Sequence, residues 1–525
     1  MLHTVPMTVM AKPSVLSKGL PKKTQSLCPE CRSIVQATIF EQDGKVMMEK
    51  ECPEHGNIVD IYWSDVDLFL KAENFAYDGI GVENPLIPNA TVCPFECGLC
   101  QLHLTHTCLA NVDLTNRCNL RCPICFANAN AAGYVYEPSY EEIVKMLQML
   151  RDERPVPTPA VQFSGGEPTI YPKIVEVLAK AKEMGFAQIQ VATNGIRFAR
   201  DPEFLKAAAR AGMNTIYLQF DGLREDIYMA ARGVPLLETK MKVIENTRSM
   251  ERPPSIVLVP TVVKSINDDQ VGEIFKFALK NIDVVRGINF QPVAFTGRID
   301  HEERSRQRYT LADLVKDLEK QTNGQITRDD FYPVPSVVPI STLASALLEQ
   351  SKVTFTTHPH CGLATYLFVK DENNVVPLTR FVEVEPLFKE FYELSKKADG
   401  AKIKFPSKVK TLSILKKHII EEKVPDGLSA TKFLQMIGGV MGDSSKEGLA
   451  KFSWKMMFIG GMHFQDNYNY DVERVKRCAI HYTTPDGRII PFCAYNGGPT
   501  FRTEVEKKFS VPIAEWRKKH GEEYT

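Results

Sequence analysis

Two runs of cysteines with the same spacing lie close together in this 525-residue chain. Residues 93–100 read CPFECGLC and residues 118–125 read CNLRCPIC, so each run contains the pattern C-x3-C-x2-C. Thiolates are soft ligands that suit zinc and iron–sulfur clusters. The sequence therefore contains candidates for two metal centres within a short stretch.

A third group of metal-binding residues lies near the N-terminus. Cys28 and Cys31 form the motif CPEC, and Cys52 and His55 form the motif CPEH. Two ligand pairs on tight, proline-containing turns suit a tetrahedral Cys3His site for zinc or for a mononuclear iron, as in zinc ribbons and rubredoxins. We expect this site to be structural or electron-transferring, because it has no obvious open position.

The composition excludes several classes of protein. Thirteen cysteines are an odd number that cannot pair completely, and the reducing cytosol disfavours disulfides. The first twenty residues lack the features of a signal peptide, and no segment reaches the roughly 20 apolar residues that span a bilayer. We expect a cytoplasmic protein, with peripheral contact at the inner membrane face as an open option. The 64 basic and 64 acidic residues balance, so no nucleic-acid partner is predicted.

An alternation of strands and helices must position the second cysteine run. Ser139 with Glu142 forms a capping box, which predicts the start of a helix after the strand 109–115 and the cysteine loop. The other expected strands are 160–163, 187–193, 215–220, 255–263 and 287–295. Helices are expected near Pro172, from Asp201 and Pro202, around 237–249 and from about 269. About six repeats predict an α/β fold, a partial (βα)6 TIM-like barrel with functional loops at the strand C-termini.

Chemically suggestive motifs follow the first four expected strands. CNLRCPIC follows the first, SGGEP (164–168) the second, TNG (193–195) the third and DG (221–222) the fourth. The first two motifs, in this order, resemble the radical S-adenosylmethionine (SAM) superfamily over about residues 109–300. TNG and DG are also ordinary turn sequences, so their assignment to the site stays open.

The radical SAM resemblance implies roles for particular residues. Cys118, Cys122 and Cys125 would hold three irons of a 4Fe-4S cluster and leave the fourth iron free to bind SAM. Reductive cleavage of SAM would then release a 5′-deoxyadenosyl radical. The residues expected to bind SAM are Gly165, Gly166 and Glu167, which would border its methionine amino group, and, as weaker candidates, Thr193, Asn194, Gln219 and Asp221.

The remaining cysteines are candidates for two auxiliary 4Fe-4S clusters. Cys93, Cys97 and Cys100 lack a GGEP motif at the right distance, and Cys108 supplies a further thiolate. His103 or His106 in place of Cys108, or a different metal, are the alternatives. Cys361, Cys478 and Cys493 are widely spaced and are either ligands of a second auxiliary cluster or buried free cysteines. If these three cysteines do bind a cluster, its fourth ligand is His358, His360 or His481, unless one iron has no protein ligand.

The C-terminal region departs from the barrel pattern. In 411–422 apolar residues surround one helical face, and the segment 449–464, LAKFSWKMMFIGGMHF, is rich in Met and aromatic residues. Such segments either lie at a membrane interface or line a lipid channel, or belong to an ordinary core.

The whole arrangement resembles the archaeal tetraether lipid synthases, a group often described as radical SAM proteins of pterin methylation. The resemblance implies C–C bond formation between terminal methyl carbons of two isoprenoid chains, with an archaeal diether lipid as substrate and a reductant such as ferredoxin. It implies three 4Fe-4S clusters, SAM and the N-terminal iron or zinc. The domains would be a rubredoxin-like or zinc-ribbon-like unit (1–85), an auxiliary iron–sulfur segment (86–108), the radical SAM core (109–300) and a substrate and auxiliary-cluster domain (301–525).

Two other functions remain open. The first is a radical SAM methyltransferase acting on a pterin precursor in methanopterin biosynthesis, whose small polar substrate requires hydrogen-bonding groups instead of an apolar tunnel. The second is a non-catalytic iron–sulfur electron carrier, which gives no purpose to a GGEP motif beside an incomplete cluster.

Overall fold

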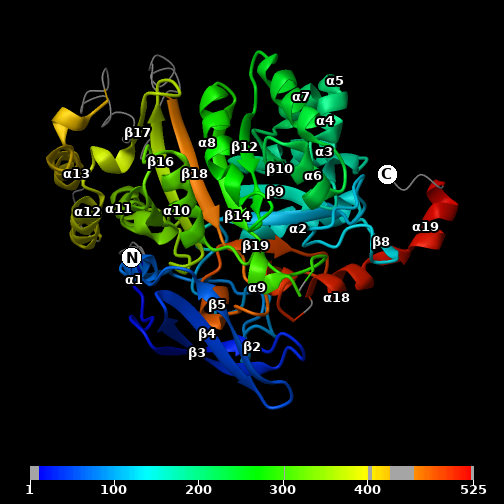
Figure 1. Cartoon of the computed structure of the whole chain (residues 1–525), viewed down its shortest axis with the longest axis horizontal. Helices are drawn as coiled ribbons and strands as arrows, with labels where there is room; N and C mark the ends of the chain where they lie inside the picture. The colour runs from blue at the N-terminus through cyan, green and yellow to red at the C-terminus, as the bar shows by residue number, and fades with distance from the viewer. Residues whose placement is uncertain (1–10, 301, 400–404, 426–454, 500, 522–525) are drawn as a thin grey trace, which may run out of the picture.

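The structure is a computed structural model that describes residues 11–300, 302–399, 405–425, 455–499 and 501–521. A four-stranded N-terminal sheet lies beside a larger α/β body (Figure 1). The N-terminal sheet is a meander of β2 (Lys22–Leu27), β3 (Ile34–Gln42), β4 (Lys45–Cys52) and β5 (Gly56–Trp63), all paired antiparallel. Helix α1 (Val66–Glu73) follows it, and β1 (Lys12–Pro13) pairs with β6 (Tyr77–Asp78).

Six parallel strands form the centre of the α/β body. They are β7 (Leu109–Thr115), β9 (Ala160–Gly165), β10 (Gln188–Thr193), β11 (Thr215–Gln219), β12 (Ser255–Val259) and β14 (Val285–Pro292). They pair in the order β7-β9-β10-β11-β12-β14, which confirms the predicted partial (βα)6 barrel. Their carboxyl ends therefore share one edge, where functional loops gather in this class of fold.

Helices cover the outer face of this sheet. The main ones are α2 (Tyr140–Asp152), α3 (Ile174–Glu183), α5 (Pro202–Ala211), α7 (Leu237–Arg248) and α8 (Val271–Lys280), with the shorter α4 (Ile196–Arg200) and α6 (Glu225–Arg232) between them. Ser139 and Glu142 form the expected capping box of α2. Alternate strand residues such as Val112, Phe163 and Ile216 are fully buried in the largest hydrophobic cluster, so burial of this outer face holds the barrel together.

The sheet continues beyond residue 300. Strand β18 (Lys455–Met462) pairs parallel with β14, and β16 (Gly362–Val369) pairs antiparallel with β18. At the opposite edge β19 (Ile480–Thr483) pairs parallel with β7 and is followed by β20 (Ile489–Pro491). The shorter strands are β8 (Tyr134–Tyr136), β13 (Thr261–Val262), β15 (Tyr332–Pro333), β17 (Val375–Pro377) and β21 (Ser510–Pro512). The C-terminal region therefore supplies both edges of the barrel sheet.

Helices precede, connect or follow these added strands along the chain. They are α9 (Arg304–Gln307), α10 (Leu311–Gln321), α11 (Val338–Leu348), α12 (Val384–Ala398), α13 (Phe405–Lys417), α16 (Val472–Lys476), α17 (Phe492–Asn496), α18 (Phe501–Lys508) and α19 (Ile513–His520). Within 411–422, Leu415 is buried in a cluster with α11 and α12, whereas Leu412 is 48% exposed.

The Met-rich segment 449–464 is a strand where the structure describes it. Residues 449–454 lie outside the described residues, and Met457 and Ile459 of β18 are fully buried. Its apolar side chains alternate with period two between α10 and the opposite face of the sheet. Of the alternatives considered from the sequence, this burial favours an ordinary core. Among the described helices, none has the length and apolar character needed to cross a membrane.

Candidate active site and metal centres

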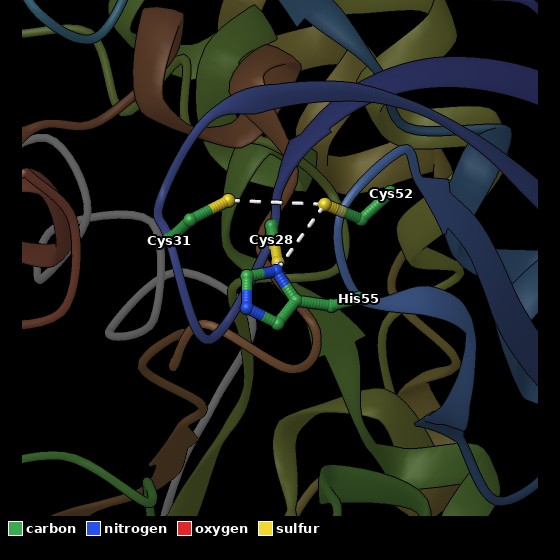
Figure 2. Close-up of side chains that lie close together, drawn as sticks. All are labelled: Cys28, Cys31, Cys52 and His55. Carbon is green, nitrogen blue, oxygen red and sulfur yellow. Dashed lines mark hydrogen bonds between the residues drawn. The ribbon is translucent and has the colours of Figure 1, made fainter.

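The N-terminal sheet brings Cys28, Cys31, Cys52 and His55 together (Figure 2). Cys28 and Cys31 lie in the turn after β2, Cys52 is the last residue of β4, and His55 lies in the turn between β4 and β5. All four ligand atoms lie within 4.8 Å of one another. The His55 ring lowers the pKa of the Cys52 thiol to about 6 by hydrogen bonding, so this thiol is ready to bind metal at neutral pH.

The separations between these atoms match those of a tetrahedral metal site. Zn–S bonds of about 2.3 Å and Zn–N bonds of about 2.0–2.1 Å imply S···N separations of about 3.6 Å and S···S separations of about 3.8 Å. The two S···N separations are 3.6 Å from Cys28 and 3.5 Å from Cys52, and the Cys31 and Cys52 sulfurs lie 3.7 Å apart. The donor set and its geometry therefore fit a zinc ion.

Replacing Cys52 with alanine should remove this metal. We expect zinc, measured by elemental analysis of the purified protein, to fall from about one ion per chain to near zero, because three ligands bind structural zinc far more weakly than four. Glu51→Ala is the matched control, since Glu51 is the exposed neighbour on the same strand. Zinc retained at wild-type level in Cys52→Ala would contradict the assignment.

The second cysteine run forms the loop at the carboxyl end of β7. Cys118, Cys122 and Cys125 pack in one small hydrophobic cluster. Burial raises the pKa of Cys118, and the charges of Glu167 and of the other two thiols add to the effect. Asn130 holds the loop by accepting a hydrogen bond from the Cys118 backbone N–H at 3.0 Å and donating to the Leu120 carbonyl at 2.9 Å. Three convergent thiols on an ordered loop fit three irons of a 4Fe-4S cluster.

Gly165 and Gly166 attach the end of β9 to this cysteine loop. A Cβ on Gly165 would lie 2.2 Å from the Thr115 carbonyl oxygen, and one on Gly166 would lie 2.1 Å from that of Arg117. The Gly166 N–H donates to Thr115 O at 2.7 Å, and the Glu167 N–H donates to Arg117 O at 2.9 Å. Only glycine allows these contacts, so the two glycines let the end of β9 approach the cysteine loop closely.

Glu167 organises the loops after β9 and β10. Its carboxylate accepts hydrogen bonds from Thr193 Oγ1 at 2.8 Å and from the Asn194 N–H at 2.9 Å. Burial raises the pKa of Glu167, although these hydrogen bonds oppose the shift. Asn194 in turn donates to Asn119 Oδ1 at 2.6 Å, beside Cys118. The structure thus gathers Glu167, Thr193 and Asn194 next to the cluster loop.

Gln219 and Asp221 belong to the same network, together with two cations that sequence reasoning missed. Asp221 accepts two hydrogen bonds of 2.8 Å from Arg232, whose Nη1 also donates to Ile124 O at 3.1 Å. Lys240 donates to Asn194 O and, at 3.2 Å, to Gln219 Oε1. Burial lowers the pKa of Lys240 to about 7. Neither cation forms part of a recognisable motif, and only their burial among these groups reveals them.

Cys93, Cys97 and Cys100 of the first auxiliary set lie close together, and both Cys108 and Cys478 are further thiols near this region. Burial raises the pKa of Cys97, and the neighbouring thiols that add to the shift are Cys93, Cys100 and Cys478. The Cys108 sulfur is buried 3.5 Å from Thr354 O. Burial raises the pKa of Cys108, and the charges of Glu153 and Cys478 add to the shift.

The two histidine alternatives for this set are occupied by other contacts. His103 Nε2 lies 2.8 Å from Cys478 O and 3.1 Å from His481 Nε2. His106 Nε2 accepts a hydrogen bond from the Thr354 N–H at 3.2 Å.

The three C-terminal cysteines also approach one another. Burial raises the pKa of Cys478, and Cys493 and Cys361 add to the shift. Arg474 Nε donates to the Cys361 sulfur and the Gln465 N–H donates to the Cys493 sulfur, each at 3.3 Å. N–H donors aimed at sulfur are a feature of cluster ligands, and the sulfurs of Cys361 and Cys493 each have one.

The three histidines considered as its fourth ligand have different surroundings. His360 Nε2 lies 3.1 Å from the Phe69 carbonyl, and His358 Nδ1 accepts a hydrogen bond from the His360 N–H. His481 pairs with His103.

Polar side chains line the face of the barrel sheet that points away from the helices. Gln162 Nε2 donates to Asn111 Oδ1, and Gln190 Nε2 donates to Gln162 Oε1, each at 2.6 Å. Tyr217 OH accepts hydrogen bonds from Asn289 and, at 3.0 Å, from Gln291. Nearer the cysteine loop, Asp113 accepts from Ser164 Oγ at 2.7 Å and pairs with Arg502 at 2.6 Å. Five of the six central strands, all except β12, thus present amide, hydroxyl and charged groups on one face.

Comparisons with known proteins cover nearly the whole chain. The profile of the radical SAM superfamily matches residues 112–278, and the profile of the HMPTM N-terminal zinc ribbon domain matches residues 20–64. The chain is 48% identical over 503 residues to the 7,8-dihydro-6-hydroxymethylpterin dimethyltransferase of Methanocaldococcus jannaschii, which covers 95% of this chain and 98% of the relative.

Other relatives match a smaller share of the chain. The GTP 3′,8-cyclase of Thermodesulfovibrio yellowstonii is 31% identical over 189 residues, or 35% of this chain and 56% of the relative. Among solved structures, SuiB of Streptococcus suis aligns over 43% of this chain and 48% of that chain, with 18% identity and a TM-score of 0.33. Similarity at that level does not bear on function.

Proposed function

Because the chain belongs to the radical SAM family of the M. jannaschii 7,8-dihydro-6-hydroxymethylpterin dimethyltransferase, we propose that it transfers methyl groups to a reduced pterin. The similarity extends over both the zinc ribbon and the C-terminal region. It therefore includes the parts of the chain that lie outside the barrel and distinguish this family from other radical SAM enzymes.

This family assignment corrects the prediction of a tetraether lipid synthase. The relative that matches 95% of the chain is a pterin dimethyltransferase, so the predicted C–C coupling of isoprenoid chains and the predicted diether lipid substrate were wrong. The misleading signals were the apolar C-terminal segments and the number of cysteine groups. Of these segments, 455–462 is an interior strand of the barrel sheet, and an auxiliary cluster is not specific to lipid chemistry.

The observation that carries the proposal is the polar inner face of the barrel. Gln162, Tyr217, Asn289 and Gln291 are half-buried side chains that expose amide and hydroxyl groups on that face. A reduced pterin is a small planar heterocycle with several hydrogen-bond donors and acceptors, and such ligands need a few well-placed polar partners. These groups already bond to one another in part, but an alkyl chain would offer no partner to their remaining donors and acceptors, and covering them without partners costs free energy.

Different residues near this face would hold the radical SAM cluster and bind SAM. When bound, the 4Fe-4S cluster and SAM supply the radical that activates an unreactive carbon. Cys118, Cys122 and Cys125 would hold that cluster, with Glu167, Thr193 and Asn194 as the supports of the SAM-binding loops. Gln219, Asp221, Gly165 and Gly166 complete this proposed SAM site.

We further propose two auxiliary clusters and a structural zinc. Cys93, Cys97 and Cys100 would form one set with Cys108 or Cys478 as the fourth ligand, and the second set would include Cys361 and Cys493. Cys28, Cys31, Cys52 and His55 would hold the zinc. A low-potential reductant such as ferredoxin would supply electrons.

Mass spectrometry of products tests the proposal directly. Anaerobically reconstituted protein should convert 6-hydroxymethyl-7,8-dihydropterin, in the presence of SAM, reductant and a one-carbon donor, into products heavier by the mass of one and two CH2 units, because each methyl group replaces a hydrogen. The matched control is Cys122→Ala, which lacks a ligand of the radical SAM cluster. Unchanged pterin in parallel with modified diether lipid would overturn the proposal.

A further inference from the structure

The segment 465–474 connects the N-terminal sheet with the C-terminal cysteines. It begins just after β18 and runs into α16, on the side of the barrel next to the N-terminal sheet (Figure 1). Its two ends carry the groups that touch sulfur: the Gln465 N–H on Cys493 and Arg474 Nε on Cys361, each at 3.3 Å. Displacement of this segment would therefore move both donors away from their sulfurs.

Three strands of the N-terminal sheet hold the middle of this segment. Lys50 on β4 donates to Asn467 O at 2.7 Å. Tyr62 on β5 donates to Asp471 Oδ2 at 2.9 Å. From β2, Ser26 Oγ donates to Tyr470 O at 2.6 Å and Thr24 Oγ1 donates to Asp471 Oδ1 at 2.7 Å. The contacts thus fall on backbone carbonyls and on one carboxylate, which fixes the path of the chain.

Internal bonds transmit this constraint to the sulfurs. The Asp471 N–H donates to Gln465 Oε1 at 2.7 Å, so the residue held by Tyr62 is tied to the residue that contacts Cys493. Arg474 donates to His463 O, and the His463 N–H donates to the Cys361 carbonyl at 2.9 Å. The segment therefore behaves as one unit with both cysteines.

A buried ion-pair network fixes the segment from another side. Arg308 contacts Asp466 at 2.6 Å and Asp60 of β5 at 3.1 Å, and all three side chains are nearly inaccessible to solvent. The Phe295 N–H, just after β14, also donates to Asp466 at 2.9 Å. The N-terminal sheet, the barrel and the segment therefore meet at one shared site.

We propose that the N-terminal sheet, through Lys50 and Tyr62, is a positioning device for the auxiliary cluster at Cys361 and Cys493. The role of the ribbon is then to keep the 465–474 segment in the conformation that presents these sulfurs. The inference rests on the auxiliary-cluster assignment proposed above. Lys50 is 1% exposed and donates to Ser26 Oγ and Leu27 O as well, so its loss would leave several buried acceptors without a donor.

The test compares metal loading of Lys50→Met, Tyr62→Phe and the control Lys45→Met. Lys45 lies on the same strand and is exposed, whereas Tyr62→Phe removes a single hydroxyl and preserves the ring. Iron and sulfide per chain and the EPR spectrum of the reduced protein are measured after anaerobic reconstitution. Wild-type protein should bind about twelve irons, the content of three 4Fe-4S clusters.

We expect Lys50→Met to lose about four irons per chain with the signal of the SAM-binding cluster unchanged, because a single 4Fe-4S cluster is affected. Tyr62→Phe should show a smaller loss, and Lys45→Met none. Wild-type protein with only one auxiliary cluster would disprove the assignment on which the inference rests. Full loading of both variants, or equal loss of all clusters in a folded Lys50→Met protein, would disprove the positioning role itself.

Discussion

Cys122→Ala should abolish the release of 5′-deoxyadenosine from SAM. The three thiols of the β7 loop are the proposed protein ligands of the SAM-binding cluster. The two thiolates left in the variant cannot hold a 4Fe-4S cluster that needs three protein ligands and one iron free for SAM. Since the cluster itself carries the chemistry, we expect a loss of roughly 10³-fold or more. The measurement is chromatography of 5′-deoxyadenosine after anaerobic incubation with SAM and dithionite.

Cys31→Ala provides the matched control for this result. It also removes one metal-binding thiol, but from the ribbon site, so SAM cleavage without substrate should stay close to the wild-type rate. Iron in Cys122→Ala should fall by about four per chain. Undiminished 5′-deoxyadenosine release from Cys122→Ala would exclude radical SAM chemistry at this loop and would favour an electron-carrier role.

The barrel was predictable because its signals are local. The short, almost continuously buried strand β7, the capping box of Ser139 and the proline start at Pro202 are each encoded within a few residues. The short helix α6 (Glu225–Arg232) was not predicted, since it follows the DG turn directly and is only eight residues long. The C-terminal strands β18 and β19 escaped prediction because their partners, β14 and β7, are distant in sequence.

In the candidate site, too, only the residues marked by local sequence patterns were predictable. The ribbon ligands and the β7 cysteines are marked by spacing, which reflects the tight turns that hold them. By contrast, Lys240 and Arg232 enter the site from α7 and α6, and only the folded chain shows that they contact Asn194 and Asp221. Which cysteines form each auxiliary set is likewise a property of tertiary structure, since Cys478 lies close to residues of both sets.

Arg232→Met should destabilise the protein more than any surface substitution nearby. Asp221 is fully buried and Arg232 nearly so, and they form a bidentate ion pair. Removing one partner of a buried pair costs about 3–5 kcal/mol, because the other charge remains without compensation. Arg224→Met is the matched control: this arginine is half-exposed and pairs with Asp269 at the surface, where an ion pair contributes only about 0–1 kcal/mol. Denaturant unfolding midpoints provide the comparison.

The pH dependence separates an unpaired charge from a simple packing defect. Burial alone would raise the pKa of Asp221, but the Arg232 charge outweighs it and the pKa lies below its usual range. In the wild type this pair therefore stabilises the fold above the unfolded pKa of about 3.9, and the contribution disappears as the pH falls through the lower folded value. Without Arg232 the buried carboxyl takes up a proton at a higher pH, so the deficit of Arg232→Met should shrink on acidification. A deficit independent of pH would indicate lost packing instead, and the double variant Asp221→Leu with Arg232→Met should recover much of the stability if the unpaired charge is the cause.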